Sequence, residues 1–110
     1  MAEKRMVRVA AVQIAPDLDT PTGTLDRVLA AIAEAAGKGA ELVVFPETFV
    51  PWYPYFSFVR PPLASGADHI KLYDHAVVVP GPVTEAVAAT ARRHGIVVVL
   101  GVNERDHGSL

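Results

Sequence analysis

The chain has 110 residues, of which 51% are hydrophobic and 20% charged, and this composition argues against intrinsic disorder. A net charge of −2 and a pI near 6.0 give no electrostatic reason to expect a nucleic-acid or membrane partner. The absence of cysteine excludes disulfides, zinc–thiolate sites and thiol catalysis by these residues themselves. Because neither a secretory signal nor an apolar stretch of bilayer length is visible, we expect a soluble cytoplasmic protein.

The first part of the chain predicts a β-α-β unit. We expect a mostly buried strand over residues 7–14 and a parallel strand, buried on both faces, over residues 42–45. Between them a single apolar stripe at helical spacing predicts a helix, formed by Leu25, Val28, Leu29, Ile32, Ala33 and Ala36. The crossover between the two strands should be right-handed.

A second helix and strand follow after a long connection. Pro82 at the first helical position and Gly95 at the carboxyl end bound a helix over residues 82–94, and residues 96–100 read as another buried strand. The connection, residues 48–79, is rich in proline and aromatic residues, and residues 68–75 within it are expected to form a short helix.

The predicted elements are too few for a closed domain. Three buried-type strands and two helices do not cover both faces of a parallel sheet, so we expect part of a larger α/β domain. A half-covered sheet with an exposed parallel edge should also make the isolated chain aggregate or oligomerise.

Glu47 is the main candidate for a catalytic residue. It follows Phe45 and Pro46 at the carboxyl end of the second strand, where open α/β sheets bind their ligands. Flanked by Pro46, Phe49 and an aromatic run, its carboxylate is expected to be partly desolvated, which would make it a stronger base. A solvated glutamate at the end of a strand is the plainer interpretation of its position alone.

The residues around Glu47 resemble the signature of the nitrilases, members of the carbon–nitrogen hydrolase superfamily. The stretch from Gly39 to Pro54, GAELVVFPETFVPWYP, has a counterpart for each element of the signature except that Trp52 stands where glycine is usual. That departure puts the local loop shape in doubt. The resemblance extends to Gln13, to residues 79–82 and to residues 99–104, and within the family it is closest to bacterial nitrilases.

The resemblance implies a fold and a chemistry. It implies an αββα sandwich in which residues 1–110 are the incomplete amino-terminal part of a single domain. It also implies a Glu–Lys–Cys centre in which Glu47 is the general base for a cysteine that attacks a small-molecule nitrile, releasing a carboxylic acid and ammonia. The chain contains no cysteine, and Lys4, Lys38 and Lys71 do not lie in the lysine motif of the family, so we expect no turnover by the chain alone.

The aromatic connection is expected to line the substrate pocket, as the resemblance implies. Trp52 and Tyr53 are the expected substrate-binding residues, with plain core packing beneath a long loop as the alternative. Residues 60–73 resemble a nitrilase insertion that contributes to subunit contacts, so the full-length enzyme is expected to be a homo-oligomer. The alternative for this segment is a solvated surface loop.

Neither a metal nor another cofactor is expected. His69, His75 and His107 do not show the spacing of a metal-ligand set, and no phosphate-binding glycine motif follows the first strand. Three other functions stay open: a related amidase or carbamoylase, a non-catalytic remnant or assembly module, and, more distantly, a flavodoxin-like ligand-binding half.

Overall fold

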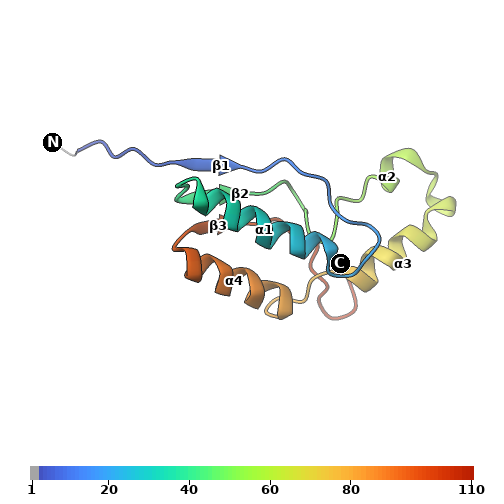
Figure 1. Ribbon diagram of the computed structural model, residues 1–110. Coiled ribbons are helices and arrows are strands. Elements are labelled where there is room, and N and C mark those ends of the chain that lie inside the picture. Colours follow the sequence, from blue (N-terminus) through green and yellow to red (C-terminus); the bar gives the residue numbers. More distant parts are fainter. Residues whose placement is uncertain (1–2) are drawn as a thin grey trace.

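A computed structural model describes residues 3–110 and shows an α/β fold built on a parallel sheet (Figure 1). The sheet has the order β1-β2-β3. Its strands are β1 (Val9–Ala11), β2 (Leu42–Val44) and β3 (Val97–Val99). The helices are α1 (Gly23–Gly37), α2 (Phe56–Val59), α3 (Gly66–His75) and α4 (Pro82–His94), with a 3₁₀ turn at Pro62–Ala64. The predicted order of strands and helices is confirmed, and α2 is an addition to it.

Side chains alternate along each strand and so point to two opposite faces of the sheet. One of these faces is covered by helices, and the other is open. The register pairs Val43 with Ala10 and Val98, and this row faces α1 and α4, which lie side by side on that face (Figure 1). Val43 is fully buried. On the opposite face the strands carry half-exposed valines: Val9 (51%), Val97 (63%) and Val99 (50%). The burial expected for β1 and β3 is therefore wrong on this face, whereas Leu42 and Val44 of β2, the strand expected to be buried on both faces, are partly buried there.

The core fills the space between the two long helices and the covered face of the sheet. The stripe predicted on α1 supplies two of its fully buried residues, Val28 and Ile32. Burial of each such side chain contributes about 1.5–3 kcal/mol relative to exposure. The remaining members come from α1, from β2 and from connecting segments: Ala35, Val43, Phe45, Phe49, Val50, Val77 and Ile96.

Local signals in the sequence explain where α4 begins and ends. Pro82 lies at its first position, and the backbone N–H of Gly81 donates to the hydroxyl of Thr84 at 2.9 Å. Gly95 closes the helix in the left-handed conformation, with φ of 63°. The strands are shorter than predicted, since only three residues of each enter the regular ladder.

The molecule is elongated, with extents of 58 × 27 × 26 Å. Its radius of gyration of 16.0 Å exceeds the value of about 13 Å typical of a compact chain of this length. Figure 1 shows the cause: the segment before β1 extends from one end of the sheet, while α2 and α3 project from the other. Within residues 3–110, no helix is long and apolar enough to cross a membrane.

The open face of the sheet predicts how the isolated chain behaves. We expect the double substitution Val97→Thr and Val99→Thr to reduce self-association in sedimentation velocity, because it removes apolar surface from the open face. The same substitution at Val43 is the matched control. Val43→Thr places a hydroxyl in the core and should lower the free energy of unfolding by about 1–3 kcal/mol in urea titrations. Unchanged self-association of the double variant would show that another surface drives it.

Candidate active site

Glu47 lies in a bulge that interrupts the parallel ladder between β2 and β3. Val44 pairs with Val99, an offset of 55 in residue number, and pairing resumes between Val50 and Val102, an offset of 52. Between these two pairings, the segment that follows β2 therefore has three more residues than the segment that follows β3. Surplus residues in a ladder redirect side chains and are frequent beside active sites.

Two phenylalanines hold the ends of this bulge together. Phe45 precedes it and Phe49 follows it; both are buried, and their ring centroids are 6.0 Å apart. The N–H of Phe45 donates to the carbonyl of Val99 at 3.0 Å, and the N–H of Val50 donates to the carbonyl of Gly101 at 3.3 Å. Because both ends are fixed in this way, the three residues between the rings project from the sheet.

Gly101 lies directly beneath the bulge. A Cβ atom at this position would lie 2.6 Å from the backbone N of Thr48, 3.0 Å from the carbonyl O of Pro46 and 3.3 Å from the carbonyl C of Glu47. Those atoms are backbone and have little freedom to move, so only glycine fits the close approach. The glycine therefore sets how near the backbone of Glu47 lies to the sheet.

Thr48 carries the backbone turn of the bulge. Its φ of 41° is in the left-handed region, which is unfavourable for a β-branched residue. Its Oγ1 atom is buried and has no hydrogen-bond partner among the residues that the structure describes. Each feature costs free energy of about 1–3 kcal/mol and persists only where the surrounding fold enforces it, which is typical of functional sites.

The aromatic segment after the bulge is tied to the body of the fold by its carbonyls. The buried hydroxyl of Thr24, at the start of α1, donates to the carbonyl of Pro51 at 2.8 Å. The side-chain amide of Asn103 donates to the carbonyl of Trp52 at 2.9 Å, and its backbone N–H donates to Val50 at 2.9 Å. These hydrogen bonds fix the backbone from which the aromatic side chains extend.

Glu47 faces a cleft of about 640 Å³ at the carboxyl ends of β1 and β2. One wall is the segment after β1, residues 13–16, and the other is the bulge itself. Tyr53, Tyr55 and Phe58 add an aromatic side. This is the position at which open α/β sheets place their ligands.

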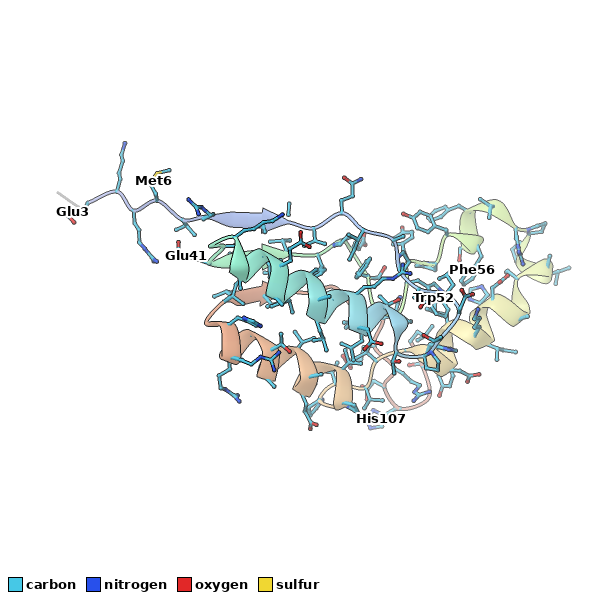
Figure 2. The ribbon with its side chains drawn as sticks, viewed as in Figure 1. Glu3, Met6, Glu41, Trp52, Phe56 and His107 are labelled. Atoms are coloured by element: carbon cyan, nitrogen blue, oxygen red, sulfur yellow. The ribbon has the colours of Figure 1, made fainter. Side chains whose placement is uncertain are left out.

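A second cleft, of about 460 Å³, adjoins the first. Tyr53 and Tyr55 line both clefts, while Trp52 and Phe56 line only the second. Figure 2 shows Trp52 and Phe56 on the side of the molecule where α2 and α3 project. The two clefts are thus neighbours that share Tyr53 and Tyr55, one on the side of Glu47 and the other on the side of α3.

The structure places the three predicted site residues as follows. Glu47 and Tyr53 meet in the first cleft, and Trp52 lies in the second, where it is 6% exposed and belongs largely to the core. Glu47 is exposed, so its expected partial desolvation is wrong for this chain: the cleft is open to water. Within residues 3–110 its carboxylate enters no ion pair.

Other parts of the site were not recognised in the sequence. Gly101, Thr48 and Asn103 shape the bulge, and Lys71 lines the second cleft. Thr48 lies in the signature stretch from Gly39 to Pro54, and Gly101 and Asn103 lie in residues 99–104, to which the resemblance extends. No role in the site was predicted for them or for Lys71. No group of three or more His, Asp or Glu side chains in the described part of the chain is arranged to hold a metal ion.

Comparison with known proteins gives a consistent picture. Residues 8–110 match the family described as carbon-nitrogen hydrolase. The whole chain is 74% identical to a nitrilase from Paraburkholderia phymatum and covers 32% of it. It is 42% identical over 104 residues to an aliphatic nitrilase from Rhodococcus rhodochrous, covering 94% of this chain and 28% of that protein. An arylacetonitrilase from Aspergillus oryzae is 36% identical over 104 residues, which are 94% of this chain and 31% of that protein. The chain therefore spans about a third of the length of the curated relatives it matches.

The close approach at Gly101 makes a prediction. We expect Gly101→Ala to lower the free energy of unfolding by about 1–3 kcal/mol, because the added methyl group overpacks against the backbone of the bulge. The measurement uses a chimera in which residues 1–110 replace the matching segment of the Paraburkholderia phymatum nitrilase, unfolded in urea. Gly37→Ala is the matched control, since a Cβ atom there meets nothing within 4 Å. Equal effects of the two substitutions would contradict the role of Gly101.

Proposed function

The chain belongs to the carbon–nitrogen hydrolase family, and on this premise we propose that it supplies the general base, Glu47, of a nitrilase. The observation that carries the proposal is the position of Glu47 on a strained bulge at the carboxyl ends of the strands, facing a cleft with an aromatic side. The names of the relatives, which are nitrilases, support a nitrile as the substrate.

The proposed reaction converts a nitrile and two water molecules into a carboxylic acid and ammonia. Glu47 accepts the proton of a cysteine thiol, and the thiolate adds to the nitrile carbon while the nitrile nitrogen is protonated, giving a thioimidate. Water adds and ammonia leaves, which produces an acyl-enzyme. A second water, deprotonated by Glu47, then releases the acid and restores the thiol.

The remaining catalytic groups must come from polypeptide outside these residues. The chain has no cysteine. A lysine that stabilises negative charge on the substrate is also expected from elsewhere, because no lysine among the described residues lines the cleft that Glu47 faces. The chain alone is therefore expected to release no ammonia from nitriles.

We propose that Tyr53 and Trp52 bind the organic group of the nitrile. Tyr53 lines both clefts and so lies beside the path from Glu47 to the second cleft. Trp52 presents part of a buried ring to the second cleft. Aromatic walls offer a large apolar contact area to the carbon skeleton of a small molecule, as is usual in ligand sites.

Two alternatives are separable by experiment. A related amidase or carbamoylase would hydrolyse amides or carbamoyl compounds in preference to nitriles when the substrates are assayed side by side. A non-catalytic assembly module would bind a complete nitrilase subunit, which would appear as an increase in mass when the two proteins are mixed.

The base role of Glu47 makes the central prediction. We expect Glu47→Gln to lower kcat for nitriles in the chimera by about 10²–10⁴-fold, since an amide does not accept the proton. Ammonia release measures the effect. Glu34→Gln is the matched control, because Glu34 lies on α1 in an exposed pair with Lys38 and should leave kcat unaltered. Near-normal turnover by the Glu47 variant would rule out its role as the base.

We also propose that the full-length enzyme is a homo-oligomer that uses the α2–α3 segment as a contact surface. Support comes from its exposed apolar side chains: Phe58 (74%), Val59 (77%), Leu63 (102%) and Ile70 (65%). Scattered apolar residues are common on surfaces, but four within a short projecting segment expose apolar area of the kind that subunits bury.

This proposal predicts how charged substitutions in the α2–α3 segment affect association of the subunits. The double substitution Leu63→Asp and Ile70→Asp should lower the mass of the chimera in light scattering, because a buried carboxylate opposes association. Met6→Asp, at a side chain that is 91% exposed on the segment before β1, is the control and should leave the mass as it was. An unchanged mass in the double variant would show that this segment is not a subunit contact.

A further inference from the structure

The second cleft joins an apolar aromatic interior to a charged rim. Buried or partly buried rings from Trp52, Tyr53 and Phe56 form its interior, and the exposed ring of Tyr55 also lines it. The rim is formed by Arg60, which follows α2, and by two residues of α3, Asp68 and Lys71.

The charges of the rim do not cancel. Arg60 and Asp68 form an ion pair at 2.9 Å and neutralise each other. Within residues 3–110, Lys71 makes no ion pair, and its Nζ atom lies 5.5 Å from the ring centroid of Trp52. The rim therefore carries one uncompensated positive charge, held above the aromatic interior.

The rings shared by the two clefts indicate which part of a substrate would lie near the ammonium group of Lys71. Tyr53 and Tyr55 line both clefts. A molecule whose reacting carbon lies near Glu47 and whose body follows these rings places its far end in the second cleft. Lys71 lines the cleft that would receive the end of such a substrate remote from the nitrile.

We propose that Lys71 is a specificity-determining residue that favours aromatic nitriles with an anionic group, such as a carboxylate, at the end of the ring remote from the nitrile. The proposal rests on the nitrilase function proposed above and adds a substrate class to it. The aromatic interior accepts the ring, and the ammonium group donates to the anion in a charge-assisted hydrogen bond. A compact point charge on a flexible stem suits a single carboxylate whose position varies slightly between substrates.

The experiment compares two substrates that differ mainly in charge. 4-(Cyanomethyl)benzoate carries the anion, and 4-methylphenylacetonitrile is its neutral counterpart. The measured quantity is the ratio of their kcat/KM values in the chimera. We expect Lys71→Met, which keeps the length of the side chain, to lower this ratio about tenfold, and Lys71→Arg to retain most of it. Higher salt should lower the ratio in the unaltered chimera and have little effect in the Lys71→Met variant.

Controls separate selection of charge from effects on structure. Lys38→Met removes an exposed lysine from the end of α1 and should leave the ratio unaltered. Lys71→Gln is a second uncharged variant, which covers the case in which the methionine variant does not fold. A ratio that is unchanged in folded Lys71 variants, or an equal loss for both substrates, would overturn the selection of charge while the nitrilase function stands. A folded chimera without turnover of any nitrile would overturn both proposals.

Discussion

The parallel ladder between β2 and β3 accommodates three surplus residues on one side, and the position of Glu47 follows from that mismatch. The surplus does not spread along the strand, because Phe45 and Phe49 are buried against each other at its two ends. The loop therefore rises from the sheet at one place, which is where both neighbouring strands end. Gly101 lets the loop approach the sheet, and the strained backbone of Thr48 completes the turn. The mismatch in strand pairing thus places the carboxylate of Glu47 on a loop that projects from the sheet.

The core and the site depend on different parts of this arrangement. α1 and α4 cover one face of the sheet and pack against its core, while the candidate site lies at the edge where the strands end. The link between the two is polar: Thr24 of α1 and Asn103 after β3 hold carbonyls of the aromatic segment. The segments that line the candidate site are thus anchored to rigid elements, which is the usual division between scaffold and site.

Sequence patterns predicted those features that depend on local chemistry. Pro82 and Gly95 fixed the bounds of α4, and the apolar stripe located α1. A glutamate directly after an apolar run indicated a candidate site, which the structure places beside a cleft. Strand burial was misjudged because a run of valines looks the same whether one face or both are covered; Val97 and Val99 are half exposed. The bulge was not predictable, since it depends on how Val50 pairs with a residue far along the chain.

The exposure of Glu47 bears on which part of the proposed enzyme positions the base and which part excludes water from it. A carboxylate in open water is well solvated and therefore a weak base, whereas removal of water strengthens it. The chain fixes the position of Glu47 firmly but leaves its carboxylate exposed, and it leaves one face of the sheet exposed as well. Under the proposed function, the polypeptide that brings the cysteine would also exclude water from the cleft. The position of the base would then be set by these residues, and its strength by the segment that covers them.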